Sequence, residues 1–145
     1  MTIDELHKMW DEAGIGKHNY RMCKSDTPRR HHADHEHNLQ VACVQWFRMQ
    51  YPQHLIYAIP NGGQRNAIVA AKLKAEGVTA GIPDLHIPTA RNGYHSLYIE
   101  MKNGKKGRLS EHQKQTIQRM QDAGHKVAVC RNIQEFINEV NNYLQ

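Results

Sequence analysis

Apolar residues recur at helical spacing in several stretches of the chain. The clearest stretch begins near Asp34, where the apolar positions follow the i, i+3, i+4, i+7, i+8 pattern of one helix face: Leu39, Ala42, Cys43, Trp46 and Phe47. This pattern predicts a helix that ends by Tyr51-Pro52, with both large aromatic residues in the core. Capping residues and terminal glycines predict further helices over residues 3–13, 64–76, 110–123 and 132–143.

Short segments of strand character lie between these helices, over residues 54–59, 84–88, 96–102 and 126–130. Asn92-Gly93 is a strong signal for a hairpin turn between the second and third segments. The order is one helix followed by α-β-α-β-β-α-β-α, which predicts an α/β fold. Residues 14–33 show no periodicity, so we expect an N-terminal helix and connector over residues 1–33 and the main domain over residues 34–145. The N-terminal helix could serve as a dimer contact or as a lid.

The composition fits one soluble domain. The chain has 145 residues, of which 39% are hydrophobic, and no apolar run approaches the length of about 18 residues that a membrane span needs. Its acidic start is unlike a secretory signal, and its three scattered cysteines do not suggest a disulfide framework. We therefore expect a protein of a reducing compartment, such as the cytoplasm of a bacterium or of a phage-infected cell.

The net charge of +5 suits a polyanionic partner. Mild basicity is as often a matter of solubility, so the positions of the cations are more informative than their total. Lys102, Lys105, Lys106 and Arg108 follow closely on the acidic residues of the predicted hairpin. This clustering favours a site that handles an anionic substrate.

The hairpin carries two carboxylates and one lysine that can meet. Alternate residues of a strand share a face, so Glu100 and Lys102 project together from the third strand segment. Asp84 begins the preceding segment, and an antiparallel hairpin brings that end close to Glu100. Pro-Asp alone or Glu-x-Lys alone is an ordinary structural pattern. Their combination, in this order on adjoining strands, favours a functional site.

The hairpin register decides whether the two carboxylates face each other. A two-residue turn at Asn92-Gly93, continued as a regular ladder, sets Asp84 opposite Met101 rather than Glu100. One extra residue in the connection brings Asp84 opposite Glu100. We therefore predict an irregularity between Pro88 and Tyr94, where the proline also disturbs ladder pairing.

Two adjacent carboxylates repel each other unless a cation lies between them. Mg²⁺, or Mn²⁺ in its place, accepts carboxylates, backbone carbonyls, waters and phosphate oxygens. The backbone carbonyl of Met101 lies between Asp84 and Glu100 in the chain's predicted arrangement and is a natural third ligand. Lys102 would orient a water or offset charge on a phosphate. This set of groups predicts metal-dependent hydrolysis of a phosphodiester bond.

Four runs and an upstream pair carry a family resemblance: Gly77–Leu85, Ile99–Lys102, Leu109–Gln113, Ala123–Val127, and Glu36 with Gln40. On these residues the chain resembles the VRR-NUC family of the PD-(D/E)XK nuclease superfamily, over residues 36 to 140. The Val-Arg-Arg signature of the family is replaced by Val129-Cys130-Arg131-Asn132, a departure that touches no expected metal ligand.

The resemblance implies a restriction-endonuclease-like αβββαβ core, a mixed sheet flanked by helices, with an extra helix after the first strand. It implies metal-dependent DNA cleavage with Asp84 and Glu100 as metal ligands and Lys102 as the catalytic lysine. It further implies that Glu36 is an additional acidic group near the metal and that Gln113 is a polar group at the edge of the site. Short members of the family are similar to viral or bacterial junction-resolving nucleases that work as homodimers.

Other polar segments have weaker interpretations. Histidines 31, 32, 35 and 37 with Cys23 could suggest zinc, but one cysteine is a poor basis for a structural zinc site. The better interpretation is that these histidines are solvated or lie near the DNA backbone beside Glu36. Arg65, beside a predicted helix start, could contact a DNA phosphate or belong to a simple turn. Lys105, Lys106 and Arg108 could follow a DNA backbone or form a solvated loop.

The sequence therefore favours a structure-specific endonuclease for branched DNA such as four-way (Holliday) junctions. Two alternatives remain. The chain could bind branched DNA without cutting it, or it could cut linear ends or mismatched duplexes.

Overall fold

The computed structural model describes residue 8 and residues 31–60, 66–104 and 107–145, with backbone alone for 31–34. The chain divides into two units, Met1–His31 and His32–Gln145, and the second holds the elements below. Apart from residue 8, the predicted helix over residues 3–13 lies outside the described residues, and the predicted domain boundary at residue 33 stays a prediction. No helix in the described ranges is long and apolar enough to cross a membrane.

The described part of the chain forms an α/β fold with a mixed sheet. Its elements follow the order α2 (His31–Gln50), β1 (Tyr57–Ala58), α3 (Ala67–Ala75), β2 (Leu85–Ile87), β3 (Leu97–Met101), α4 (Glu111–Asp122), β4 (Lys126–Cys130) and α5 (Ile133–Leu144). The strands lie in the order β1-β2-β3-β4. The first two pairs are antiparallel and β3 pairs with β4 in parallel. The predicted order of elements is confirmed over these residues.

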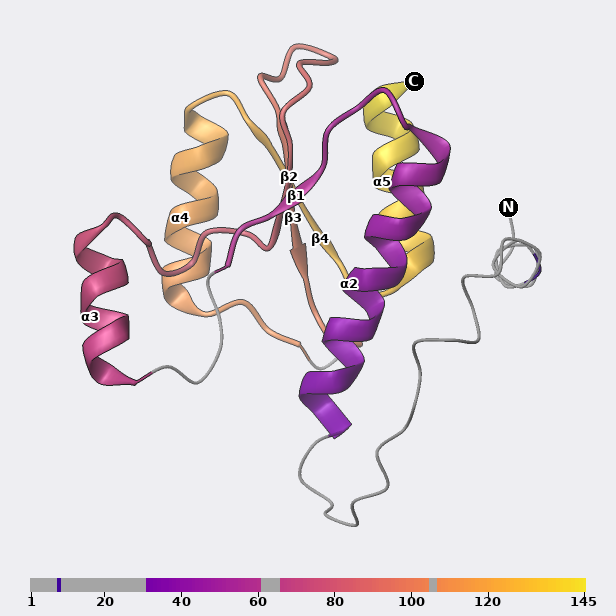
Figure 1. Ribbon diagram of the computed structural model, residues 1–145. Helices are drawn as coiled ribbons and strands as arrows, with labels where there is room; N and C mark the ends of the chain where they lie inside the picture. The colour runs from indigo at the N-terminus through magenta and orange to yellow at the C-terminus, as the bar shows by residue number, and fades with distance from the viewer. Residues whose placement is uncertain (1–7, 9–30, 61–65, 105–106) are drawn as a thin grey trace. The chain divides into compact units, whose positions relative to one another are not determined.

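Helices cover both faces of this sheet (Figure 1). Helices α2 and α5 lie side by side on one face, and α4 lies on the other. The core fills the space between the sheet and the α2–α5 pair, where Trp46 and Phe47 are 2% and 0% exposed. The ring of Trp46 meets Phe136 of α5 edge to face, with 6.0 Å between the ring centroids. The predicted core position of both aromatic residues is confirmed.

Two predicted elements differ from the structure. The first strand is limited to Tyr57–Ala58 rather than residues 54–59, because β2, its partner in the sheet, is itself only three residues long. Helix α3 begins at Ala67 rather than residue 64: Asn66 has a non-helical backbone, and its side chain accepts a hydrogen bond from the N–H of Ile68. No residue of α3 is buried, and Ile68 is 78% exposed. Although its residues are mostly apolar, the helix therefore buries no side chain among the described residues.

The hairpin between β2 and β3 contains the predicted irregularity. Asn92 and Gly93 have positive φ angles of 52° and 82° and form a two-residue turn that pairs Arg91 with Tyr94. The last regular pair before the turn is Ile87 with Leu97. Three residues, 88–90, therefore stand opposite two, 95–96.

The extra residue sets the register of the strands. Leu85 pairs with Ile99, and the next position along the ladder puts Asp84 opposite Glu100. The prediction of an irregularity between Pro88 and Tyr94 is confirmed, and its place is the segment before the turn rather than the turn itself. This bulge is the local cause that brings the two carboxylates together.

Candidate active site

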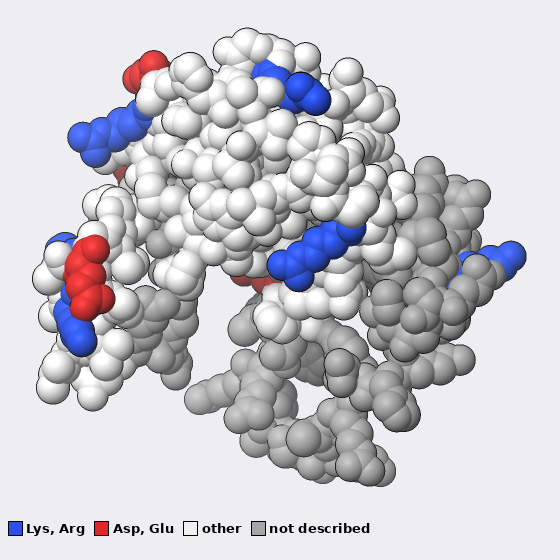
Figure 2. Space-filling model, turned by 45° about the horizontal axis from the view of Figure 1, so that its top comes forward, with Lys and Arg blue, Asp and Glu red and all other residues white. Residues whose placement is uncertain are grey.

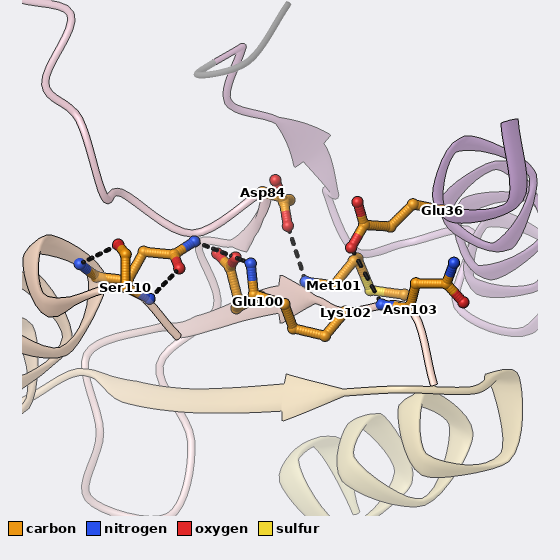
Figure 3. Close-up of polar contacts among 8 residues, drawn as sticks. Glu36, Asp84, Glu100, Met101, Lys102, Asn103 and Ser110 are labelled. Atoms are coloured by element: carbon orange, nitrogen blue, oxygen red, sulfur yellow. Dashed lines mark hydrogen bonds and ion pairs between the residues drawn. The ribbon is translucent and has the colours of Figure 1, made fainter. Parts of the chain in front are cut away.

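Asp84 is held at two points at the start of β2. Its carboxylate Oδ2 accepts a hydrogen bond from the backbone N–H of Met101 at 2.8 Å (Figure 3). Its backbone carbonyl accepts from the N–H of Ile59 at 2.8 Å, just after β1. The side chain is therefore fixed against the end of β3, where Glu100 and Lys102 also lie.

Glu100 and Lys102 project from the same face of β3, as the alternation of a strand requires. The ammonium Nζ of Lys102 lies 2.7 Å from Oε1 of Glu100, and the two side chains are 16% and 3% exposed. The same Oε1 accepts a hydrogen bond from Nε2 of Gln113 on α4. The carboxylate of Glu100 is thus buried between a strand and a helix, with one cation and one amide donor against it.

Glu36 approaches the same place from α2. Its Oε1 accepts a hydrogen bond from the backbone N–H of Asn103 at 3.1 Å, one residue after the lysine of the hairpin. Figure 3 shows the carboxylates of Glu36, Asp84 and Glu100 along the end of β3, contributed by a helix and two adjoining strand ends. Residues separated by more than sixty positions in the sequence therefore meet at one strand end.

The electrostatics of the site disfavour its negative charges. Burial raises the pKa of Asp84, the N–H of Met101 and the charge of Lys102 oppose this, and the nearby charge of Glu36 adds to it. Burial also raises the pKa of Glu100; the bond with Lys102 opposes the rise, and repulsion from Asp84 increases it. The lysine therefore neutralises the acidic cluster only in part, and an additional cation would be stabilised there.

Comparison with known proteins agrees with this geometry. The family model of the VRR-NUC domain matches residues 25–133, which is more than half of the chain. The chain belongs to the VRR-NUC domain family. A solved structure titled "VRR_NUC domain protein" is 29% identical in sequence, with a TM-score of 0.63, and the match covers 75% of this chain and 87% of that chain. A search of curated proteins found no match.

The resemblance seen in the sequence is thereby confirmed, and the family is one of nucleases. The VRR-NUC match spans every residue of the cluster described above, from Glu36 to Gln113. The carboxylates and the lysine thus lie together in the structure of a nuclease domain.

The donor set of the VRR-NUC site fits a hard divalent cation. Continuing the β2–β3 register puts Pro83 opposite Met101, and proline has no N–H to donate to the Met101 carbonyl. Since Met101 directs its N–H toward Asp84, its carbonyl faces the same side of the strand. Two carboxylates and one backbone carbonyl are ligands that Mg²⁺ accepts.

Glu36 does not form a metal-holding group of three side chains with Asp84 and Glu100. Among the described residues, no group of three His, Cys, Asp or Glu side chains is placed to hold a metal ion. The expected roles of Asp84 and Glu100 as metal ligands therefore stay predictions. The expected place of Glu36 beside a metal stays a prediction. The same observation gives no support to zinc at His35 and His37, whose side chains are exposed, and Cys23 lies outside the described residues.

The predicted DNA-contacting cations are placed only in part. Arg108 is exposed just before α4, whereas Arg65, Lys105 and Lys106 lie outside the described residues. On the face shown in Figure 2, the basic side chains of the described residues stand apart from one another. The proposed contacts of these cations with DNA therefore stay predictions.

The sequence did not reveal two polar partners of the site. Asn103 supplies a backbone donor to Glu36, and Ser110 pairs with Gln113 in a capping box at the start of α4. The Ser-x-x-Gln spacing was visible in the sequence as a helix start. Its connection to Glu100 depends on where α4 packs, which no local pattern contains.

The sequence patterns also did not predict a row of aromatic and imidazole rings next to the carboxylates. The hydroxyl of Tyr57 lies 2.5 Å from Nδ1 of His86, and the ring of His86 stacks on Tyr98 with 4.0 Å between centroids. Burial lowers the pKa of His86, and His125 contributes to this. These rings lie on the same face of the sheet as Asp84 and Glu100, because His86 and Tyr98 each stand two residues along their strands from those carboxylates.

Proposed function

We propose that this VRR-NUC domain is a divalent-metal-dependent endodeoxyribonuclease that hydrolyses phosphodiester bonds in branched DNA, such as four-way (Holliday) junctions. The observation that carries the proposal is the convergence of Asp84, Glu100 and Lys102 at the end of β3. A protein that only bound DNA would gain nothing from buried carboxylates next to an anionic backbone. The element order α2-β1-α3-β2-β3-α4-β4 supports the further inference of an αβββαβ core with α3 inserted after the first strand.

Asp84, Glu100 and the Met101 carbonyl would hold Mg²⁺ or Mn²⁺. Such an ion, when bound, supplies a Lewis acid for the phosphate and lowers the pKa of a bound water. Glu36, through the repulsion that it exerts on Asp84, would add to the negative potential that attracts the cation.

Lys102 would act on the substrate. Its side chain is 16% exposed, so we infer that its ammonium, while in contact with Glu100, can reach a phosphate oxygen or the attacking water. A cation at this place would offset the charge that develops on the phosphate during hydrolysis. Gln113 donates to Glu100 and would orient that carboxylate rather than contact DNA.

The substrate geometry and the partner are further proposals. We infer that the domain works as a homodimer on branched DNA, since a four-way junction presents two strands to cut and a two-fold dimer presents two sites. The net charge of +5 supports a DNA partner. Arg65, Lys105, Lys106 and Arg108 would contact the phosphate backbone on either side of the cut.

A cleavage assay with a labelled four-way junction tests the proposal. Purified protein in Mg²⁺ or Mn²⁺ should produce discrete cuts, and Asp84→Asn, Glu100→Gln and Lys102→Met should each abolish them while binding is retained in Ca²⁺. Glu111→Gln is the matched control, because Glu111 is an acidic residue whose side chain is 73% exposed on α4. It should cut at the wild-type rate.

The same assay separates the alternatives. Tight, salt-sensitive binding without product on any DNA would establish a binding module and refute nuclease activity. Cleavage of linear ends or mismatched duplexes, while four-way junctions stay uncut, would establish a nuclease of linear ends or mismatched duplexes instead. A measurement of the molecular mass of the active protein in solution determines whether it is a dimer.

A further inference from the structure

The capping box at the start of α4 connects a helix terminus to the candidate active site. Ser110 Oγ accepts a hydrogen bond from the backbone N–H of Gln113 at 3.2 Å, and Gln113 Oε1 accepts one from the backbone N–H of Ser110 at 3.0 Å. Both bonds are those expected of a helix start. The carboxamide of Gln113, however, has a second partner, Oε1 of Glu100, to which its Nε2 donates.

The capping box fixes which end of the carboxamide faces the carboxylate. A backbone N–H can only donate, so the atom of Gln113 that meets the Ser110 N–H must be the oxygen. The nitrogen Nε2 is then directed to Glu100. The reversed amide would place its oxygen against a carboxylate oxygen, and two acceptors repel. Because the Ser110 N–H engages Gln113 Oε1, the group that Gln113 presents to Glu100 is the donor Nε2.

This donor constrains the carboxylate of Glu100. Lys102 Nζ and Gln113 Nε2 both contact Oε1, from the strand side and from the helix side. Their convergence on one oxygen fixes the rotation of the carboxylate and leaves Oε2 for a cation. A carboxylate held by one donor alone could rotate and present either oxygen, which weakens a metal site that needs a fixed geometry.

We propose that Ser110 is a positioning residue of the active site: its hydroxyl, by accepting from the Gln113 backbone N–H, fixes the first turn of α4 so that its backbone N–H holds the Gln113 carboxamide and Glu100 presents one oxygen to the divalent ion. The inference rests on the proposed metal-dependent nuclease function. It assigns to Ser110 a role in metal binding beyond the capping of α4, although the side chain touches neither metal nor DNA.

The test must separate this role from helix capping. Ser110→Ala removes the hydroxyl that holds the Gln113 backbone N–H, so the Ser110 backbone N–H is no longer fixed against the Gln113 carboxamide. Asn132→Ala is the matched control, because the Asn132 side chain caps α5 by accepting from the N–H of Glu135 at 2.9 Å. Both variants should show a fall in melting temperature of similar size in metal-free buffer, because each loses one N-cap acceptor. The rise in melting temperature on adding Mn²⁺ reports metal binding separately, because only the folded state holds the ion.

Ser110→Ala should need about 10-fold more Mn²⁺ than the wild type for the same rise in melting temperature, the usual effect of losing a partner of a metal ligand. Its kcat at fixed Mn²⁺ should fall about 10-fold, with KM for DNA unchanged. Asn132→Ala should match the wild type in both. Ser110→Thr keeps the hydroxyl and should restore the wild-type Mn²⁺ response.

A double-mutant cycle tests the route through Gln113. In a Gln113→Ala background, Ser110→Ala should cause no further loss of the Mn²⁺ response, because the group that it positions is already gone. Losses that add would overturn the inference, and so would a Ser110→Ala protein that responds to Mn²⁺ as fully as Asn132→Ala. A wild type that neither binds Mn²⁺ nor cuts DNA would instead refute the proposed function, and this inference with it.

Discussion

Replacing Lys102 with methionine removes the cation from a nearly buried ion pair, and the structure allows its cost to be worked out. The ammonium lies 2.7 Å from Glu100, whose side chain is 3% exposed. Removing one partner of a buried pair costs about 3–5 kcal/mol, because the other charge is left uncompensated. The Gln113 donor remains and Lys102 is 16% exposed, so we expect a cost at or just below the lower end of this range, about 2–3 kcal/mol.

Urea and thermal unfolding in metal-free buffer measure this cost. For a chain of this length, it corresponds to a fall in melting temperature of about 4–12 °C. The double variant Glu100→Gln with Lys102→Met should recover much of the loss, because no unpaired charge is then buried. Both variants should be inactive on the four-way junction, since each lacks the cation at the phosphate.

Lys102→Arg distinguishes a structural ion pair from a catalytic lysine. Arginine keeps a positive charge against Glu100 and should restore most of the stability. Its planar, larger head group cannot occupy the same point near the phosphate, so cleavage should stay well below the wild-type rate. Wild-type cleavage by the arginine variant, or a methionine variant that loses less than about 0.5 kcal/mol, would show that the pair is an ordinary strand-face ion pair.

Three further predictions concern the surroundings of the site. Asp84→Asn keeps an acceptor for the Met101 N–H and should abolish cleavage. Burial raises the pKa of Asp84, so between the usual aspartate value, about 3.9, and the raised pKa the unfolded chain binds fewer protons than the folded one, and wild-type stability should fall relative to the variant as pH rises through that window. Equal pH slopes in urea unfolding would contradict this. Gly81→Ala places a Cβ 2.9 Å from the carbonyl oxygen of His112, at a residue whose φ is +85°. We expect the free energy of unfolding to fall by about 1–3 kcal/mol and cleavage to slow, and an unchanged melting temperature would contradict this. Burial raises the pKa of Cys130 to about 12, so in a variant without the other two cysteines a thiol reagent should react only as fast as the chain unfolds, and rapid native-state labelling would exclude this.

Local patterns in the sequence predicted much of the fold. The period-two alternation of β3 placed Glu100 and Lys102 on one face, which the 2.7 Å ion pair confirms. The caps at Ser110 and Asn132 marked the starts of α4 and α5, since capping needs only residues a few positions apart. Even the bulge between Pro88 and Tyr94 followed from counting residues along the hairpin.

Other features depended on contacts between distant segments. The length of β1 was set by its partner β2, and α3 remained exposed although its residues are mostly apolar. The hydrogen bond of Glu36 with Asn103 joins residues 67 positions apart, so no local spacing could reveal it. The family resemblance implied that Glu36 belongs near the site, but it gave no partner for this side chain.

The sequence by itself determined which groups the VRR-NUC site contains: two carboxylates, a lysine and a carbonyl on one hairpin, because strand alternation and hairpin register are local geometry. Only the tertiary structure decided the direction of their pKa shifts and their orientation. Burial raises the pKa of Asp84 and Glu100, and α4 brings the Gln113 donor onto Glu100. Desolvation and packing of this kind arise from the whole fold, so they cannot be read from residue spacing.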